Sequence, residues 1–332
     1  MSDRRLRHSS GRTRDGGHAV TEQVKPLISV IVPLYNEAES VPELYSELAE
    51  ALRPHSDRCE MIFVDDGSRD GSCERLQAIR ETDARVKIVR LRVNQGKSTA
   101  LQAGFREAEG QIIVTLDADL QDDPKEIPRF LQKLEEGFDL VSGWKVKRYD
   151  PWFRRFLSAI FNRITSRFTG VRLHDFNCGY KAYRRAVIGE LRLYGELHRF
   201  IPVLASWRGF RIGEIEVAHR ARRYGLSRYG IERIPRGFFD LLTVLMLTRY
   251  TTRPLHFFGL VGVLVGLIGF GIIGYLSIGW LFGQWIGGRP LFILGTLMVI
   301  GGLQLVSFGL LAEMIVYGST RESDPPIDLV LK

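Results

Sequence analysis

The segment QIIVTLDADLQDDP, residues 111–124, joins an apolar strand to the four carboxylates of Asp117, Asp119, Asp122 and Asp123. Aspartates often follow strands in ordinary turns, because their side chains hydrogen-bond to the local backbone and tolerate unusual dihedral angles. A cluster of this kind can also serve a ligand that needs negative charge. The rest of the sequence has to decide between these two interpretations.

Five segments of the sequence are rich in β-formers and nearly continuous in apolar residues. They are residues 27–35, 59–66, 86–93, 111–119 and 138–146. Parallel strands that are buried on both faces have this composition. Helical patterns separate several of them, at residues 40–52, 72–81 and 98–109. This alternation predicts an α/β fold with a Rossmann-like, mostly parallel sheet and helices on both faces.

The first predicted helix opens with the Ser-x-x-Glu pattern at Ser40 and Glu43. In a capping box of this type the serine side chain satisfies a backbone N–H in the first turn. We therefore expect Ser40 to cap this helix.

Polar side chains follow three of the predicted strands. The first strand runs into Pro33, Tyr35, Asn36 and Glu37, the second into Asp65 and Asp66, and the fourth into Asp117 and Asp119. In open parallel sheets, ligands bind beyond the carboxyl ends of the strands. We therefore expect these side chains to converge on one edge of the sheet.

Carboxylates one residue apart at a strand end suit a hard cation, Mg²⁺ or Mn²⁺, that is shared with substrate phosphates. A nucleotide is then the expected occupant. Asp66 would accept from the edge of the base, with the backbone near Tyr35 and Asn36 framing it. Asp117 would lie near the ribose or the metal, and Asp119 should be more sensitive to substitution than Asp122 or Asp123.

No glycine-rich phosphate loop follows the first strand. Residues 94–98, NQGKS, contain Gly-Lys-Ser but lack the upstream glycine of a P-loop. The sequence therefore disfavours ATP hydrolysis and dinucleotide redox chemistry.

Two long apolar segments near the carboxyl end predict membrane spans. Residues 257–282 and 291–312 contain no charged side chain, and each is longer than the ~20 residues that a helix needs to cross a bilayer. Buried core helices are the alternative, but soluble helices of this length usually carry a polar stripe. Residues 283–290 form a short connection, so the two spans should form a hairpin.

The arginines before the first span orient the protein in the membrane. Arg249 and Arg253 precede it, and the positive-inside rule then places the sheet domain in the cytoplasm. Residues 1–23 are polar and basic without the apolar region of a signal peptide. We expect an integral protein of the bacterial inner membrane.

The formal net charge of +8 is concentrated in segments that fit a membrane surface better than nucleic acid. Residues 151–168 should form a basic amphipathic helix at that surface, and residues 234–250 should form a second helix. The apolar face of the first would carry Trp152, Phe156, Ile160 and Ile164, with Arg155, Asn162, Arg163 and Arg167 turned away. The three cysteines, Cys59, Cys73 and Cys178, show no metal or disulfide spacing.

The expected domain organisation follows from these segments. Residues 1–26 form a basic tail, residues 27–233 the catalytic domain, and residues 234–253 a juxtamembrane helix. Residues 254–317 hold the two spans, at about 257–282 and 291–314, and residues 318–332 form a cytoplasmic tail.

Five motifs in this order carry a family resemblance. They are SVIVPLYNE (29–37), VDDGSRDGS (64–72), TLDADLQDDP (115–124), HDFNCGYKAY (174–183) and HRARRYGLSRY (219–229). Followed by two spans, they resemble the family 2 glycosyltransferases that load a sugar onto polyprenyl phosphate, the bactoprenol-phosphate glucosyltransferase and dolichol-phosphate mannosyltransferase group. The resemblance covers residues 27–317.

The resemblance implies a GT-A fold and a set of site residues. A Mg²⁺ or Mn²⁺ ion would be held by matches to Asp117, Asp119 and Gln121. Nucleotide contacts would come from Pro33, Tyr35, Glu37, Asp66 and Lys97, to which the strand ends add Asn36 and Asp65. Asp175 matches the family's active-site aspartate near the acceptor.

The last motif matches a phosphate-binding segment of the family at Arg222, Ser227 and residue 228. This sequence has Arg228 where lysine is usual, so that a planar guanidinium group replaces a compact ammonium group. His198 and Arg199 are further candidates for binding the diphosphate or the acceptor. An ordinary helix face is the alternative for these two residues.

Together these features predict an inverting glycosyltransferase that moves a hexose from a nucleotide sugar, such as UDP-glucose, to undecaprenyl or another polyprenyl phosphate. A processive polysaccharide synthase is one alternative, but Trp207-Arg208 lacks the Q-x-x-R-W frame of those enzymes. An inactive membrane scaffold is another, which Asp119, Gln121 and Asp175 argue against. The sugar, the nucleotide and the oligomeric state, a homo-oligomer included, stay open.

Overall fold

The computed structural model describes residues 27–146, 152–221, 223–224, 233–250, 253–283, 285 and 290–319. For residues 152–157, 233–238, 249 and 319 it describes the backbone only.

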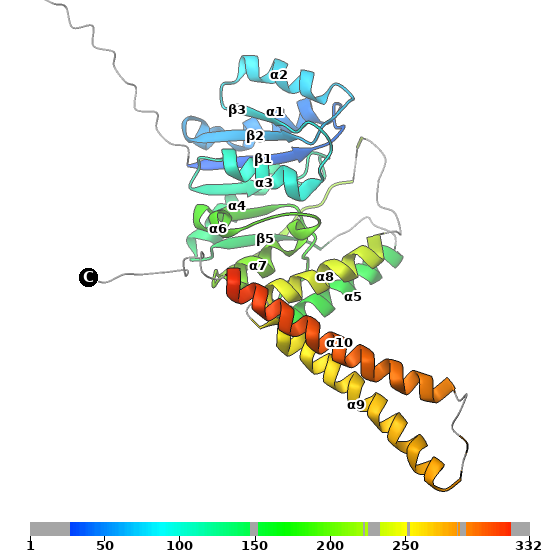
Figure 1. The fold of residues 1–332 in the computed structure, drawn as a ribbon. Helices are drawn as coiled ribbons and strands as arrows, with labels where there is room; N and C mark the ends of the chain where they lie inside the picture. The colour runs from blue at the N-terminus through cyan, green and yellow to red at the C-terminus, as the bar shows by residue number, and fades with distance from the viewer. Residues whose placement is uncertain are drawn as a thin grey trace, which may run out of the picture.

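A seven-stranded sheet with the order β3-β2-β1-β4-β6-β5-β7 forms the centre of the protein (Figure 1). The strands are β1 Ile28–Leu34, β2 Cys59–Asp65, β3 Val86–Arg90, β4 Ile112–Thr115, β5 Leu140–Lys145, β6 Lys181–Arg184 and β7 Ile212–Val217. All pairings are parallel except those of β6, which runs antiparallel to both β4 and β5. The five strands and the mostly parallel sheet expected from the sequence are confirmed.

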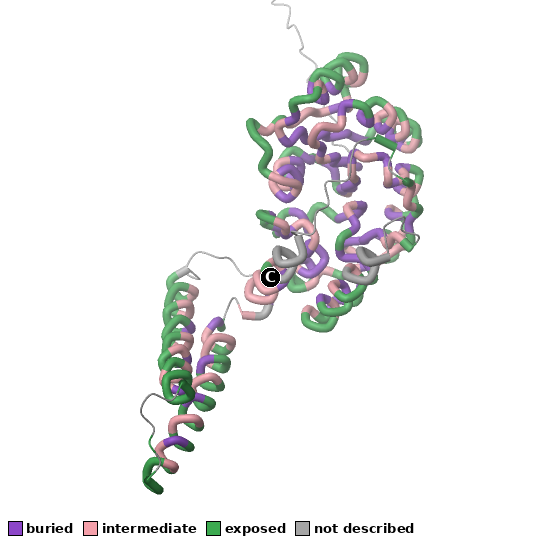
Figure 2. The backbone as a smooth tube through the Cα atoms, turned by 90° about the vertical axis from the view of Figure 1, so that its right-hand side faces the viewer, coloured by how far each residue is buried: buried purple, intermediate pink, exposed green. Residues whose placement is uncertain are grey.

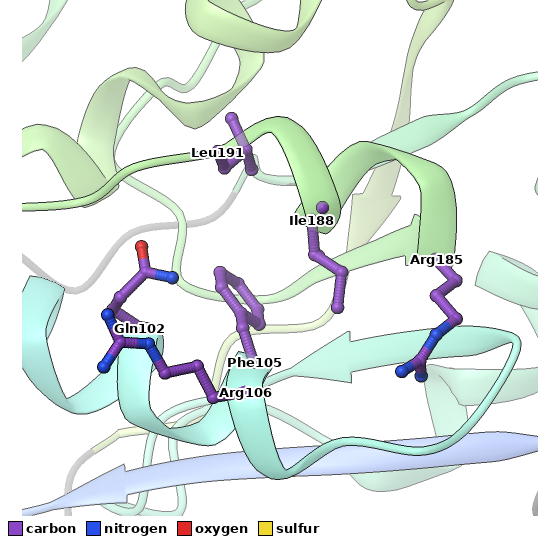
Figure 3. A pocket seen from close by; sticks show the side chains of 7 residues that line it. Gln102, Phe105, Arg106, Arg185, Ile188 and Leu191 are labelled. Atoms are coloured by element: carbon purple, nitrogen blue, oxygen red, sulfur yellow. The ribbon is translucent and has the colours of Figure 1, made fainter.

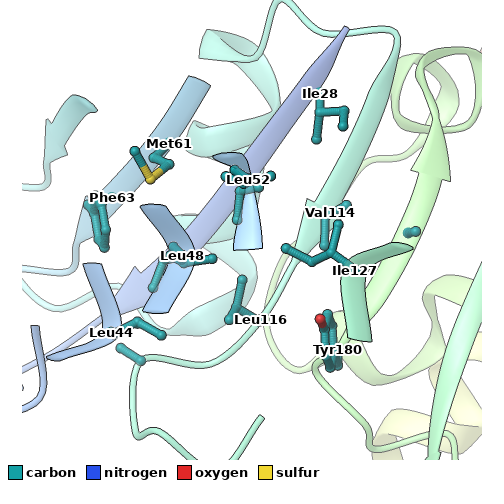
Figure 4. Packing of buried hydrophobic residues seen from close by; sticks show 14 of the residues in the cluster. Ile28, Leu44, Leu48, Leu52, Met61, Phe63, Val114, Leu116, Ile127 and Tyr180 are labelled. Carbon is teal, nitrogen blue, oxygen red and sulfur yellow. The ribbon is translucent and has the colours of Figure 1, made fainter. Parts of the chain in front are cut away.

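The helices of the sheet domain cover both faces of the sheet. They are α1 Val41–Ala51, α2 Ser72–Thr82, α3 Lys97–Glu107, α4 Ile127–Glu135, α6 Arg185–Glu190 and α7 Ile201–Trp207, with 3₁₀ turns η1 Arg53–Arg58, η2 Pro124–Glu126 and η3 Leu197–Phe200. Successive strand residues point to opposite faces, so Val30 and Val32 of β1 pack with α1, while Ile31 joins the core under α3. Figure 4 shows the first of these clusters, where Leu44 and Leu48 of α1 lie over the sheet.

The capping box expected at Ser40 does not form. The backbone of Ser40 is already helical (φ −84°, ψ −26°), and its side chain makes no capping hydrogen bond. The hydroxyl donates to the carbonyl oxygen of Glu37 at 3.0 Å instead. Glu43 pairs with Arg223, 180 residues away in sequence. A tertiary contact has therefore replaced the local one.

Two helices, α5 Trp152–Thr169 and α8 Arg233–Arg249, lie side by side between the sheet and the C-terminal hairpin (Figure 1). Leu241 and Val244 of α8 are buried in the core under α3. The pair exposes several apolar side chains, with Ile160 and Ile164 of α5 each 40% exposed and Phe239 of α8 63% exposed.

The structure corrects one residue of the predicted amphipathic pattern in α5. Arg163 and Arg167 are exposed as expected, but Asn162 is buried and donates its side-chain N–H to the carbonyl oxygen of His174 at 2.7 Å. The helix therefore has a polar contact with the sheet domain on its inner side. The side chains of Trp152, Arg155 and Phe156 lie outside the described residues.

The two apolar segments form a helical hairpin of α9 Pro254–Leu281 and α10 Pro290–Ser319. Both helices are long and apolar enough to cross a membrane, and Figure 2 shows how little of the hairpin is buried compared with the sheet domain. Small residues allow the helices to approach closely. A Cβ on Gly302 would lie 2.5 Å from the carbonyl oxygen of Gly262, and one on Gly269 would lie 2.7 Å from that of Gly295.

We predict that Gly302→Ala destabilises the hairpin, because the added methyl group meets backbone atoms of α9 that cannot move aside. The neighbouring Gly301→Ala is the matched control, since a Cβ there has open space around it. Alanine in a helix is favoured over glycine by about 1 kcal/mol, so Gly301→Ala should be neutral or stabilising. Thermal unfolding in detergent micelles measures the difference, and equal melting temperatures for the two variants would contradict the packing.

Candidate active site

The loops after β1 and β2 are joined at the carboxyl edge of the sheet. The backbone N–H of Asn36 donates to Oγ of Ser68 at 2.8 Å, and that of Arg69 donates to Oδ1 of Asn36 at 2.9 Å. Asn36 has a left-handed backbone conformation, with φ +54°, which asparagine tolerates better than most residues. The N–H of Glu37 donates to Ser72 at 3.0 Å. The structure thus brings the two predicted nucleotide-binding loops together.

Asp65 and Asp66 both turn toward the protein. Asp65 is completely buried, and its Oδ1 accepts the backbone N–H of Ser68 at 2.8 Å. Asp66 accepts the N–H groups of Gln95 and Gly96 at 2.7 and 2.8 Å. Burial raises the pKa of Asp66, and these two hydrogen bonds oppose the rise. Asp65 therefore supports its loop from inside, and nucleotide contacts by either side chain stay predictions.

By holding Gln95 and Gly96, Asp66 places Lys97 at the start of α3, beside the predicted metal-binding residue Asp117. The Lys97 ammonium forms an ion pair with Asp117. Burial raises the pKa of Asp117, but the positive charges of Lys97 and Lys145 outweigh that effect and lower the pKa to about 2. Gly179 lies against this ion pair, and a Cβ there would be 2.7 Å from both Asp117 Oδ1 and Lys97 Nζ. The Asp117 carboxylate is therefore charged, and its side chain is still 32% exposed.

Asp119 and Gln121 follow Asp117 through a strained turn. Leu120 between them has φ +60°, a left-handed conformation that is uncommon for a residue with a branched side chain and often marks a functional site. Asp119 Oδ1 accepts the N–H of Gln121 at 3.2 Å. The backbone of Gln121 is held by the N–H of Arg220 at 2.9 Å.

These residues fit a hard divalent cation. Mg²⁺ is usually bound by one or two carboxylates together with substrate phosphates, which matches the donor set of Asp117, Asp119 and the amide oxygen of Gln121. Within the described residues, no group of three or more His, Cys, Asp and Glu side chains is placed to hold a metal ion without other ligands.

The other two carboxylates of the opening segment have structural roles. Asp122 is completely buried, and its Oδ1 lies 2.7 Å from Nζ of Lys145 on β5. Asp123 caps the N–H of Lys125 at 3.0 Å and pairs with Arg220 at 2.6 Å. These contacts concern stability, and the smaller effect on activity expected for Asp122 and Asp123 than for Asp119 stays a prediction. The sequence predicted neither the burial of Asp122 nor the ion pairs of Asp122 and Asp123.

Basic residues surround the carboxylates. Lys181 on β6 is buried and donates to the carbonyl oxygen of Cys178. Burial and the charge of Lys97 lower the pKa of Lys181. The sequence analysis missed Lys181 and Lys145, although a lysine inside an otherwise apolar strand pattern is a usable signal.

His198 lies in the same neighbourhood. Its Nδ1 is 3.0 Å from Oγ of Ser98. Burial, together with the positive charges of Lys97 and Arg199, lowers its pKa well below the usual range, so the imidazole is neutral at pH 7. Arg199 pairs with Glu196 at 3.0 Å.

Asp175, the predicted acceptor residue, is buried near Lys181. It is 1% exposed, and its Oδ1 accepts the N–H of Asn177 at 3.0 Å. Lys181 interacts electrostatically with both Asp175 and Asp117. The structure therefore places the predicted metal motif and the predicted acceptor residue around one buried lysine.

The basic motif that begins at His219 is only partly described. Arg220 contacts Glu47 at 2.8 Å as well as Asp123, and Arg223 pairs with Glu43. Arg220 and Arg223 thus hold this segment against α1. Arg222, Ser227 and Arg228 lie outside the described residues.

Two pockets lie at opposite edges of the sheet, and only the first is on the side of the site. One of about 330 Å³ lies at the ends of β2 and β3 and is lined by Gly67, Ser68, Arg69, Arg90, Leu91 and Arg92. The other, of about 220 Å³, lies between α3 and α6, where Phe105 and Ile188 form its apolar wall (Figure 3). Arg185 in this second pocket donates to the carbonyl oxygens of Ala108 and Gly110. Asp117 and Asp175 line neither pocket.

Comparison with known proteins gives relatives that span most of the chain. Residues 29–192 match glycosyl transferase family 2. A dodecaprenyl-phosphate galacturonate synthase from Rhizobium johnstonii is 40% identical over 305 residues, 90% of this chain and 90% of the relative. An undecaprenyl-phosphate 4-deoxy-4-formamido-L-arabinose transferase from Pseudomonas paraeruginosa is 40% identical over 300 residues, 89% of this chain and 87% of that one.

A solved structure shares the fold of the sheet domain. Glucosyl-3-phosphoglycerate synthase from Mycobacterium tuberculosis, crystallised with Mg²⁺ and uridine diphosphate, aligns with a TM-score of 0.52 at 20% identity. The alignment covers 68% of this chain and 79% of that structure. The GT-A fold expected from the sequence is thereby confirmed.

We predict that Asp122→Ala lowers stability strongly, because it leaves the ammonium of Lys145, whose side chain is 13% exposed, without its partner. Breaking a buried ion pair by removing one member typically costs about 3–5 kcal/mol. The double variant Asp122→Asn with Lys145→Met should recover most of this loss, since no charge is left unpaired. Thermal unfolding of the two variants measures the effect, and an Asp122→Ala protein as stable as wild type would refute the buried pair.

Proposed function

This chain belongs to glycosyltransferase family 2, and we propose that it transfers a sugar from a nucleotide sugar to a polyprenyl phosphate at a membrane surface. The observation that carries the proposal is the extent of the similarity to the dodecaprenyl-phosphate enzyme. An alignment of 305 residues, 90% of this chain, is too long to be confined to the sheet domain and must extend into the apolar hairpin. The similarity thus extends to the part of the protein that would meet a lipid.

For the donor we propose a UDP-linked sugar bound at the edge where β1, β2 and β4 end. Asp117, Asp119 and Gln121 would hold Mg²⁺ or Mn²⁺, which, when bound, neutralises the charge that develops on the diphosphate. Lys97 already lies beside Asp117 and would contribute a second positive charge there. Pro33, Tyr35, Asn36 and Glu37 would line the nucleotide side.

An oxygen of the acceptor phosphate would attack the anomeric carbon of the donor sugar from the Asp175 side, with inversion, and the bond from that carbon to the departing nucleoside diphosphate would break. Asp175 has the place of a general base, but a phosphate monoester has its second pKa near ~6 and is mostly a dianion at pH 7. A base would add little. We therefore assign Asp175 to orienting the acceptor phosphate, or the basic residues that hold it. His198 and Arg199, with Arg222, Ser227 and Arg228, are proposed to bind the phosphates.

The membrane side of the proposal rests on α5, α8 and the hairpin. The exposed apolar side chains of Ile160, Ile164 and Phe239 would lie at the lipid surface, next to α9 and α10 in the bilayer. Arg163 and Arg167 would meet anionic headgroups. We propose that the sheet domain faces the cytoplasm and that the membrane is the bacterial inner membrane, in keeping with the basic residues that precede α9.

Incubating the full-length protein in detergent with undecaprenyl phosphate, Mg²⁺ and a panel of UDP-sugars tests the proposal. We expect one UDP-sugar, with UDP-glucose and UDP-galacturonate as first candidates, to give a lipid product whose mass equals undecaprenyl phosphate plus one sugar residue. Asp119→Ala should abolish the product, because the cation loses a direct ligand. A wild-type protein that forms no lipid product with any nucleotide sugar would exclude the function.

We predict that Arg163→Glu with Arg167→Glu weakens docking on anionic membranes. Each basic residue near such a surface contributes about 1 kcal/mol, so the apparent KM for the lipid should rise by at least ~10-fold in vesicles containing anionic lipid. The KM for the nucleotide sugar should not change. Arg75→Glu with Arg80→Glu is the control, because both arginines are exposed on α2, far from α5 in Figure 1. An equal rise in both KM values would argue against a docking role.

A further inference from the structure

We propose that Glu214 on β7 is a positioning residue for the transfer reaction, which holds Asp175 in place through the backbone of residues 174–175. This inference rests on the proposed function, because it presumes that Asp175 orients the acceptor. Neither the family motifs nor the charge pattern of the sequence points to Glu214. Its role follows from the contacts of its carboxylate.

The Glu214 carboxylate gathers three donors from two consecutive residues. Its Oε1 accepts the backbone N–H of His174 at 2.9 Å and that of Asp175 at 3.2 Å. Its Oε2 lies 2.7 Å from Nδ1 of the His174 ring. Hydrogen bonds to an ionised acceptor are shorter and stronger than neutral ones. The backbone at residues 174–175 is therefore fixed directly to β7.

His174 is held from two further directions. Its ring stacks on Trp144 of β5, with the ring centroids 4.0 Å apart and the planes 14° from parallel. Its carbonyl oxygen accepts the side-chain N–H of Asn162 from α5 at 2.7 Å. The residue before Asp175 thus has contacts with β5, β7 and the helix that we place at the membrane surface.

The burial of Asp175 makes these contacts important for its position. Asp175 is 1% exposed, so water cannot easily replace Glu214 as the acceptor for its backbone N–H. A buried N–H without a partner is unfavourable, and the loop is expected to shift until the group finds another acceptor. A displacement of about 1 Å at a reacting group can lower a rate about 100-fold.

The strand that carries Glu214 does not need this side chain for its own structure. β7 pairs with β5 through backbone hydrogen bonds over Ile212–Val217, and its contribution to the apolar clusters comes from other residues, such as Val217 and Ile215. Removal of the carboxylate should therefore disturb residues 174–175 while the sheet stays intact. Glu216, two residues further on the same face and exposed, provides a matched control.

The test compares Glu214→Ala, Glu214→Gln and Glu216→Ala in the full-length protein, with steady-state kinetics for both substrates. Glu214→Ala should lower kcat by about 10- to 100-fold, with the KM for the nucleotide sugar and the affinity for UDP unchanged. Glu214→Gln should stay within a few-fold of wild type, because its amide oxygen still accepts the two backbone N–H groups. Glu216→Ala should behave as wild type.

A double variant separates positioning from a general structural effect. If Glu214 acts through Asp175, adding Glu214→Ala to Asp175→Asn should cause no further loss of kcat. Independent, multiplicative losses would overturn the inference, as would a loss of UDP affinity in Glu214→Ala.

The outcomes also distinguish this inference from the function on which it rests. An active wild-type enzyme with a fully active Glu214→Ala variant overturns the inference alone. A fully active Asp175→Asn variant overturns it together with the role of Asp175. Absence of any lipid product from wild type overturns the proposed function and the inference with it.

Discussion

The candidate site depends on compensating several carboxylates at one edge of the sheet, of which Asp122 and Asp175 are buried and Asp117 is partly exposed. An isolated charge in a protein interior is very unfavourable, so buried carboxylates need cationic or N–H partners. Asp122 has Lys145 from β5, and Asp117 has Lys97 from α3. The charge of Lys181 from β6 interacts with both Asp117 and Asp175. The partners come from three different elements, so the charge balance is complete only when the whole edge of the sheet has assembled.

The antiparallel strand β6 makes this arrangement possible. It lies between β4 and β5 and runs opposite to both, so the loop before it enters at the same edge where β4 ends. That loop carries Asp175 and Gly179, and Gly179 is small enough to let it pass against the ion pair of Lys97 and Asp117. Because Asn162 of α5 also binds this loop, the proposed membrane surface and the proposed acceptor residue are connected by a single short segment.

Local patterns in the sequence were sufficient for the framework of the fold. The apolar runs of β1 to β5 and the uncharged segments of α9 and α10 report burial or lipid exposure directly, because both depend on the composition of a continuous segment. The convergence of Asp66 and Asp117 also followed from the sequence, since parallel strands end at a common edge. The motifs then identified the family, which the full-length relatives confirm.

Only the tertiary structure decided which polar residues are buried and which partners they have. Asp119 and Asp122 are similar in sequence context, yet one is partly exposed and the other completely buried against Lys145. Ser40 and Glu43 have the sequence pattern of a capping box, but Glu43 pairs with Arg223 instead. Glu214 binds His174, which is 40 residues away in sequence. Each of these choices depends on a partner that is distant in sequence. Periodicity and local propensity determine segments, whereas the pairing of charges and hydrogen bonds is determined only when those segments pack.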